Sequence, residues 1–169
     1  MVKSGRKWSA GEARRSAYLG ELEIMFLGRY EHSIDDKGRM TIPARYRELL
    51  ADGAFVTLGF DQNLMVLTAD DFGRLIQNLR EKSLTDPTAR QLNRLMFSNA
   101  DRVDVDKAGR ILIPQNLRAA AHLEGPAVVI GAGEYFEIWA PSHWQQQDEE
   151  LQDPEITAQR FATLDVSIK

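Results

Sequence analysis

Apolar and polar residues alternate over several short stretches of this chain, and the alternation predicts strands. Two such stretches end at Ile34 and Val105, each directly before a turn that is rich in Asp and Gly. Because a half-buried strand places an apolar side chain at every second position, we expect one face of each strand to be buried. Four apolar runs rich in β-branched and aromatic residues predict further strands, at 54–59, 63–67, 126–131 and 135–139.

Apolar residues three or four positions apart predict helices in other segments. After Asp70 and Asp71, either of which can cap a helix, the apolar positions are Phe72, Leu75, Ile76 and Leu79. Pro87 suits the first turn of a second helix, whose apolar positions are Ala89, Leu92, Leu95 and Met96. We expect this helical pair to link two halves of the chain.

One motif occurs in both halves. Residues 35–43 recur as 106–114, with Asp, Gly, Arg, Ile and Pro in the same order and at the same spacing. A short helix follows each copy, and we expect these helices to begin at Pro43 and Pro114 and to end near Gly53 and Gly125. Two strands and a longer helix then complete each unit. A unit of about 70 residues rarely buries enough apolar surface alone, so we expect the two units to share one core.

The predicted architecture is an α+β fold, in which two β-hairpin and helix units form one domain with pseudo-two-fold symmetry. Residues 1–24 are basic and lack apolar periodicity, so we expect them to form a disordered N-terminal extension. Residues 153–169 have little to pack against and are expected to fray or to dock on a neighbour. The expected segments are the extension (1–24), the first unit with its linking helices (25–97), the second unit (98–144), and a C-terminal helix and tail (145–169).

Each copy of the motif predicts a tight hairpin, whose outgoing strands are Arg39–Ile42 and Arg110–Ile113. The carboxylate of Asp35 can accept hydrogen bonds from backbone N–H groups two residues further on. Gly38 can adopt a positive φ because it has no Cβ. Asp106 and Gly109 occupy the same positions in the second copy. We therefore expect both turns to have the same geometry.

The Asp and Arg of each motif are four residues apart, and this Asp-x-x-x-Arg spacing allows two interpretations. In one, the pair is a structural ion pair that braces the hairpin. In the other, the Asp holds an outward-facing Arg that binds an anionic partner. An exposed ion pair contributes only about 0–1 kcal/mol to stability, so the spacing by itself favours neither interpretation.

The distribution of charge is more informative than the net charge of −4. Basic residues surround both motifs, whereas acidic residues concentrate toward the C-terminus, at Asp148, Glu149, Glu150, Asp153 and Glu155. A molecule that is polarised in this way can present a basic face to DNA in spite of its acidic total.

Several classes of site have no support in the sequence. The chain has no cysteine, and its three histidines lack metal-ligand spacing, so we expect no metal site. The Gly131-Ala132-Gly133 turn lacks the third glycine and the following helix that a dinucleotide site needs. No apolar run is long enough to span a membrane, and no signal peptide is evident. We expect a cytosolic binding protein without a cofactor or a small-molecule substrate, rather than an enzyme.

Three segments of the chain, 25–28, 35–47 and 136–139, closely resemble the MraZ family of bacterial transcriptional regulators. The resemblance extends over residues 25–144 and leaves residues 1–24 outside the usual pattern. It implies two SpoVT/AbrB-type units per chain, a ring-shaped homo-oligomer, and a cytoplasmic, nucleoid-associated location. It also implies binding to short direct repeats of double-stranded DNA upstream of the division and cell-wall gene cluster, including the regulator's own promoter, usually as a repressor.

The resemblance also implies which residues bind DNA. The family's Asp-x-x-x-Arg motif corresponds here to Asp35 with Arg39 and to Asp106 with Arg110, and both copies are intact. We expect the DNA-binding residues to be these four and their neighbours, namely Arg39, Arg110, Lys37, Lys107, Asp35, Asp106, Gly38 and Gly109. The alternative is an oligomeric protein-interaction scaffold in which the Asp-x-x-x-Arg pairs are only structural.

Overall fold

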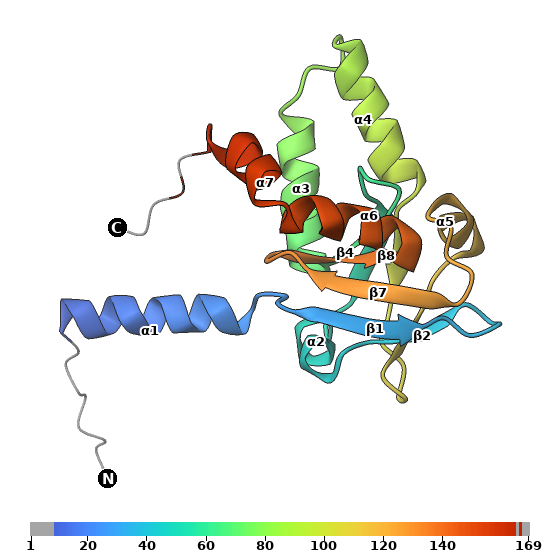
Figure 1. The fold of residues 1–169 in the computed structure, drawn as a ribbon, viewed down its shortest axis with the longest axis horizontal. Coiled ribbons are helices and arrows are strands. Elements are labelled where there is room, and N and C mark those ends of the chain that lie inside the picture. Colours follow the sequence, from blue (N-terminus) through green and yellow to red (C-terminus); the bar gives the residue numbers. More distant parts are fainter. Residues whose placement is uncertain (1–8, 165, 167–169) are drawn as a thin grey trace.

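The computed structural model describes residues 9–164 and Val166, and Figure 1 shows how their elements are arranged. The strands are β1 (Arg29–Ser33), β2 (Arg39–Thr41), β3 (Ala54–Leu58), β4 (Leu64–Thr68), β5 (Asp101–Val103), β6 (Arg110–Leu112), β7 (Pro126–Gly131) and β8 (Tyr135–Trp139). The helices are α1 (Ala10–Glu23), α2 (Ala44–Leu49), α3 (Ala69–Arg80), α4 (Pro87–Ser98), α5 (Gln115–Ala120), α6 (Pro141–Gln152) and α7 (Pro154–Phe161). The α+β class and the tandem repeat that the sequence predicts are confirmed.

The strands form two antiparallel sheets, and most of their pairings join one repeat to the other. The larger sheet has the order β1-β7-β8-β4-β3-β5, and the smaller sheet is the two-stranded ribbon of β2 and β6. The pairs β3–β4 and β7–β8 lie within one repeat, whereas β1–β7, β3–β5, β4–β8 and β2–β6 cross between the repeats. The two repeats are therefore interleaved.

An aromatic cluster from both repeats lies at the centre of the shared core. The ring centroid of Phe26 lies 4.9 Å from that of Tyr46 and 5.1 Å from that of Phe136, and all three side chains are fully buried. The Tyr46 hydroxyl donates a hydrogen bond to the Leu27 carbonyl oxygen at 2.7 Å. Burying one large apolar side chain stabilises a fold by about 1.5–3 kcal/mol, so this cluster helps to hold the repeats together. The expectation of one core is confirmed.

Each motif forms the predicted tight turn but not the predicted hairpin, because the strands that flank the turn pair mainly with the other repeat. Between β1 and β2 there is only an isolated bridge, which joins Ile34 to Met40. β2 instead pairs with β6, where Met40 lies opposite Ile111 and both side chains are buried. Interleaving thus buries the apolar centres of two strands that are too short to form a stable hairpin alone.

The linking helices α3 and α4 follow the predicted periodicity. Phe72 and Leu79 are the buried side chains of α3, and Phe72 stacks on Phe55 of β3 with ring centroids 4.3 Å apart. The predicted cap at Asp70 or Asp71 is wrong by two or three residues. Thr68 caps α3, because its hydroxyl accepts a hydrogen bond from the Asp71 backbone N–H at 3.1 Å.

The N-terminal segment differs from the prediction of a disordered extension. Ala10–Glu23 forms the helix α1, whose side chains are all exposed and which stands away from the sheet in Figure 1. Local interactions account for the helix. Ser9 and Glu12 form a reciprocal capping box, in which each side chain accepts a hydrogen bond from the other residue's backbone N–H. Residues 1–8 lie outside the described part of the chain.

The C-terminal segment is also more ordered than predicted, because α7 follows α6 after a single residue. Asp153 caps α7 by accepting hydrogen bonds from the backbone N–H groups of Glu155 and Ile156, at 3.0 and 3.3 Å. Arg160 of α7 forms an ion pair with Glu150 of α6 at 2.6 Å. These local contacts order residues that bury no large apolar surface.

Candidate nucleic-acid interface

The two motif turns have almost the same hydrogen bonds. In the first turn, Asp35 Oδ1 accepts from the backbone N–H groups of Lys37 and Arg39, at 3.0 and 2.9 Å. Gly38 has a φ of 84°, a conformation that L side chains rarely adopt. The second turn repeats this arrangement at Asp106, Ala108, Gly109 and Arg110, with both backbone N–H groups 2.9 Å from the Asp106 carboxylate.

In each turn the Asp also holds the side chain of the Arg. Arg39 Nε lies 2.9 Å from Asp35 Oδ2, and Arg110 Nε lies 2.9 Å from Asp106 Oδ2. Each arginine side chain is about one third exposed, at 33% and 32%. Among the described residues, no hydrogen bond or ion pair engages the terminal Nη nitrogens of these arginines. Each guanidinium is therefore fixed through Nε, while its Nη groups have no partner among the described residues.

The two motif carboxylates are held in the charged form. A hydrogen bond from the backbone N–H of Arg39 lowers the pKa of Asp35 below its ordinary value, and the Arg39 side chain lowers it further. The backbone N–H and side chain of Arg110 act on the pKa of Asp106 in the same way. Because both carboxylates are ionised near pH 7, each can orient its arginine continuously.

The β2–β6 ribbon brings both motif arginines onto one face. Arg39 lies opposite Leu112, and Thr41 lies opposite Arg110. Because side chains alternate between the two faces of a strand, these four residues share the outer face. The residues between them, Met40 and Ile111, point into the core. Arg39 and Arg110 are diagonal neighbours on this ribbon, a position that places Cα atoms about 7–8 Å apart.

Two further arginines link each short helix to the turn of the other repeat. Arg47 of α2 donates from Nε to the Ile42 carbonyl oxygen at 3.1 Å, and its guanidinium lies against Gly109. Arg118 of α5 makes the equivalent bond at 3.0 Å and lies against Gly38, where an added Cβ would come within 2.9 Å of its guanidinium. Neither arginine forms an ion pair among the described residues, so both add positive charge beside the ribbon.

The sequence alone did not assign Arg47 and Arg118 to the site. Their spacing could have indicated a shared role, because Arg47 stands eight residues after Arg39 and Arg118 stands eight residues after Arg110. The contact of each with the opposite turn was not predictable, since it depends on the interleaving of the repeats.

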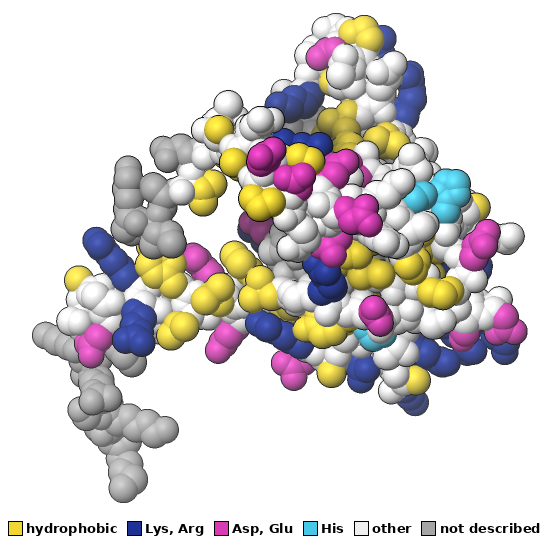
Figure 2. Space-filling model, viewed as in Figure 1, with side chains coloured by type: hydrophobic (Ala, Val, Ile, Leu, Met, Phe, Trp, Pro, Cys, Tyr) yellow, Lys and Arg dark blue, Asp and Glu magenta, His cyan; other side chains and the backbone are white. Residues whose placement is uncertain are grey.

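The predicted lysines lie at the exposed tips of the turns. Lys37 and Lys107 are both exposed but are not equivalent, because Lys37 corresponds to Ala108 and Lys107 corresponds to Asp36. Figure 2 shows Lys and Arg side chains gathered below the end of β1, on the side of the molecule where β2 lies in Figure 1. The structure thus brings all eight predicted site residues into one region with two turns and one ribbon.

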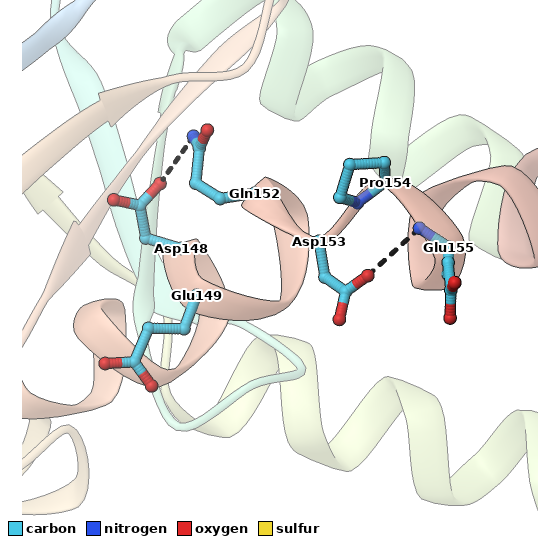
Figure 3. A pocket seen from close by; sticks show the side chains of 6 residues that line it. All are labelled: Asp148, Glu149, Gln152, Asp153, Pro154 and Glu155. Carbon is cyan, nitrogen blue, oxygen red and sulfur yellow. Dashed lines mark hydrogen bonds between the residues drawn. The ribbon is translucent and has the colours of Figure 1, made fainter.

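The opposite charge gathers on α6 and α7. Figure 3 shows an open hollow between these helices, lined by Asp148, Glu149, Gln152, Asp153, Pro154 and Glu155. Four of these six side chains are acidic, so the hollow is unsuited to a polyanion. Within the described residues, no group of His, Cys, Asp or Glu is arranged to hold a metal ion. Among all the described helices, none is long and apolar enough to cross a membrane.

Comparison with known proteins places the chain in a family. The family model for the MraZ protein, which its description likens to antitoxins, matches residues 25–95 and again 96–166. The chain belongs to the MraZ family. Each matched MraZ segment contains one Asp-x-x-x-Arg turn and one strand of the ribbon, while α1 precedes the first match.

Curated MraZ relatives cover most of the chain. The transcriptional regulator MraZ of Thermomicrobium roseum is 46% identical over 142 residues, which cover 83% of this chain and 99% of the relative. That of Roseiflexus castenholzii is 47% identical over 121 residues, covering 72% and 85%. That of Alkaliphilus oremlandii is 40% identical over 144 residues, covering 84% and 100%. The chain therefore resembles these MraZ regulators over nearly their whole length.

Proposed function

We propose that this chain is a sequence-specific transcriptional regulator that binds double-stranded DNA through the outer face of the β2–β6 ribbon. The observation that carries the proposal is the common outward face of Arg39 and Arg110, whose Nη groups have no partner among the described residues. The relatives named as transcriptional regulators support the same function.

The geometry of the ribbon suits the major groove of DNA. This groove is about 12 Å wide and admits a two-stranded β-ribbon. An arginine with both Nη groups available can bond in a bidentate manner to guanine O6 and N7, a contact that discriminates between bases by about 1–3 kcal/mol. Lys37, Lys107, Arg47 and Arg118 would bind phosphates at the flanks and fix the position of the ribbon.

A single ribbon offers few contacts, so we propose that the regulator acts as a ring-shaped homo-oligomer on short direct repeats. Linked weak contacts to successive repeats gain affinity through effective concentration. Exposed apolar side chains, including Phe60 (65% exposed) and Phe161 (48% exposed), support contacts between subunits. The proposed target is the DNA upstream of the division and cell-wall gene cluster, including the regulator's own promoter, with repression as the outcome. The proposed location is the cytoplasm, at the nucleoid.

Fluorescence anisotropy of the intact chain with the DNA upstream of its own gene tests this function. We expect tight binding to the native duplex and much weaker binding to a shuffled duplex of the same composition at near-physiological salt. The affinity should fall steeply with salt, with a log–log slope of about −0.9 for each phosphate contact. Equal binding to both duplexes, or no binding to either, would contradict a sequence-reading regulator.

A second candidate function is an oligomeric protein-interaction scaffold. The observation in its favour is that Asp35 accepts three hydrogen bonds within its own turn, so the Asp–Arg pair also braces the turn. A scaffold would form the same oligomer but would not distinguish the native duplex from the shuffled one. The anisotropy experiment separates the two functions.

A further inference from the structure

The outer face of the ribbon is not chemically two-fold symmetric. Thr41 and Leu112 occupy equivalent positions in the two repeats, two residues after the motif arginine. Leu112 is 56% exposed and lies directly opposite Arg39. The neighbouring apolar residue on the same strand, Ile111, is 1% exposed and belongs to the core. The exposed leucine is therefore an apolar group set on an otherwise polar, basic face.

We propose that Leu112 is a specificity-determining residue that contacts the C5-methyl group of a thymine in the major groove. This inference rests on the proposed function. It specifies that Leu112 of β6 recognises thymine. Thymine is the base that presents a methyl group in the major groove, and apolar side chains are the groups that recognise it. A leucine on this face has no hydrogen-bonding group with which to read a base edge.

The register of the ribbon places this contact beside the base that Arg39 reads. Residues directly opposite each other in an antiparallel pair have Cβ atoms about 4.5–5.5 Å apart. Successive bases along one DNA strand are about 3.4 Å apart. Because the base pair that holds an arginine-bound guanine has no thymine, Leu112 is expected to reach the neighbouring pair, and a thymine next to that guanine is the predicted element of the site.

Thr41 occupies the position equivalent to Leu112 in the first repeat, so the two ends of the ribbon's outer face differ chemically. Thr41 beside Arg110 presents a hydroxyl and one methyl group, whereas Leu112 beside Arg39 presents an isobutyl group. The turns differ as well, since Lys37 stands in one where Ala108 stands in the other. Because the two halves make different contacts, the ribbon is expected to favour one orientation of the DNA.

Single replacement of each thymine by deoxyuridine in the native duplex removes only the methyl group and tests the inference. For the wild-type protein, we expect affinity to fall about three- to fivefold at the contacted thymine, the effect of one buried methyl group. Leu112→Ala should bind the thymine duplex more weakly than wild type does. It should also bind the thymine and deoxyuridine duplexes equally well. Leu84→Ala removes another exposed leucine, 73% exposed, and should keep the wild-type response.

Leu112→Thr supplies a second variant that copies the first repeat, and thermal melting of each variant verifies its fold. An unchanged deoxyuridine effect in both Leu112 variants, or wild-type binding that is insensitive at every thymine, would overturn the role of Leu112. These outcomes are distinct from failure of the proposed function, in which the wild-type protein would not prefer the native duplex to the shuffled duplex at all.

Discussion

At the scale of single residues, Gly38 and Gly109 determine whether the motif turns can close. Both have positive φ, at 84° and 77°, and an arginine from the other repeat packs against the space where a Cβ would be. The requirement at these positions is therefore both conformational and steric. The sequence predicted the conformational part from the turn chemistry, but the steric part depends on a contact between repeats.

Gly38→Ala is expected to destabilise the protein. The left-handed backbone costs a non-glycine residue about 1–2 kcal/mol, and the Arg118 guanidinium must also move. We expect a decrease in melting temperature of about 2–8 °C, measured by circular dichroism. Gly73→Ala in α3 is the matched control, because nothing lies within 4 Å of its added Cβ. A melting temperature for Gly38→Ala that equals that of wild type would contradict this account of the turn.

The motif carboxylates predict a specific loss of stability in acid. The pKa values of Asp35 and Asp106 are lowered in the folded protein, so their stabilisation is present above the unfolded pKa of about 3.9. It is lost as the pH falls through the folded pKa. In urea titrations between about pH 5 and pH 3, the unfolding midpoint of wild type should fall more than that of Asp35→Asn/Asp106→Asn.

The control for this comparison is Asp36→Asn, a change in the first turn at a carboxylate that accepts no hydrogen bond among the described residues. It should retain the acid sensitivity of wild type. Wild type and the double variant would lose stability in parallel if the motif carboxylates did not contribute.

At the scale of elements, the interleaved pairing makes each repeat incomplete. β1 needs β7, β5 needs β3, and β2 needs β6, so the sequence order of strands differs from their spatial order. An isolated first repeat would lack the strand that pairs with β2 at Met40, and an isolated second repeat would lack the strand that pairs with β6 at Ile111. Both of these side chains are buried in the intact fold.

Residues 25–95 expressed alone are therefore expected to form no folded monomer. The fragment should be unfolded or should form a two-fold homodimer that copies the missing half, and mixing it with residues 96–166 should restore a folded complex. Light scattering and circular dichroism distinguish these states. A monomeric fragment with cooperative unfolding would contradict the interleaved fold.

The sequence correctly predicted the strands and helices whose residues show a clear local pattern of apolar positions. Its apolar runs correctly predicted β3, β4, β7 and β8, and its periodicity correctly predicted α3 and α4. It did not predict the pairing of β2 with β6, because strands of three residues carry little local signal and their partner lies far along the chain. It did not predict the helix α1, because apolar periodicity is absent there and the Ser9–Glu12 capping box is the main local signal for a helix start.

At the scale of the whole molecule, basic and acidic side chains gather on different surfaces, a separation that the net charge of −4 does not reveal. Basic side chains surround the ribbon and turns, and acidic side chains cover α6 and α7 in Figure 2. Arg29 lies outside the ribbon and is already paired with Asp148, at 2.8 Å. α1 lies at the opposite end of β1 from the first turn, so its basic residues are separated from the ribbon (Figure 1). The basic surface that is proposed to contact DNA thus comes from the interleaved repeats.

If the motif arginines read DNA as proposed, they contribute strongly to DNA affinity and little to stability. The most direct test measures DNA affinity and the free energy of unfolding on the same samples of wild type, Arg39→Ala and Arg110→Ala. Each variant should lose about 5- to 150-fold in affinity for the native duplex, the loss of one bidentate contact. Its free energy of unfolding should stay within about 1 kcal/mol of wild type, as for an exposed ion pair.

Arg94→Ala is the matched control, because this exposed arginine lies on α4 and its side chain forms no hydrogen bond or ion pair among the described residues. It should leave both quantities unchanged. Retained affinity for the native duplex together with a large loss of stability in Arg39→Ala and Arg110→Ala would contradict a role in reading DNA, and would identify the pairs as structural braces.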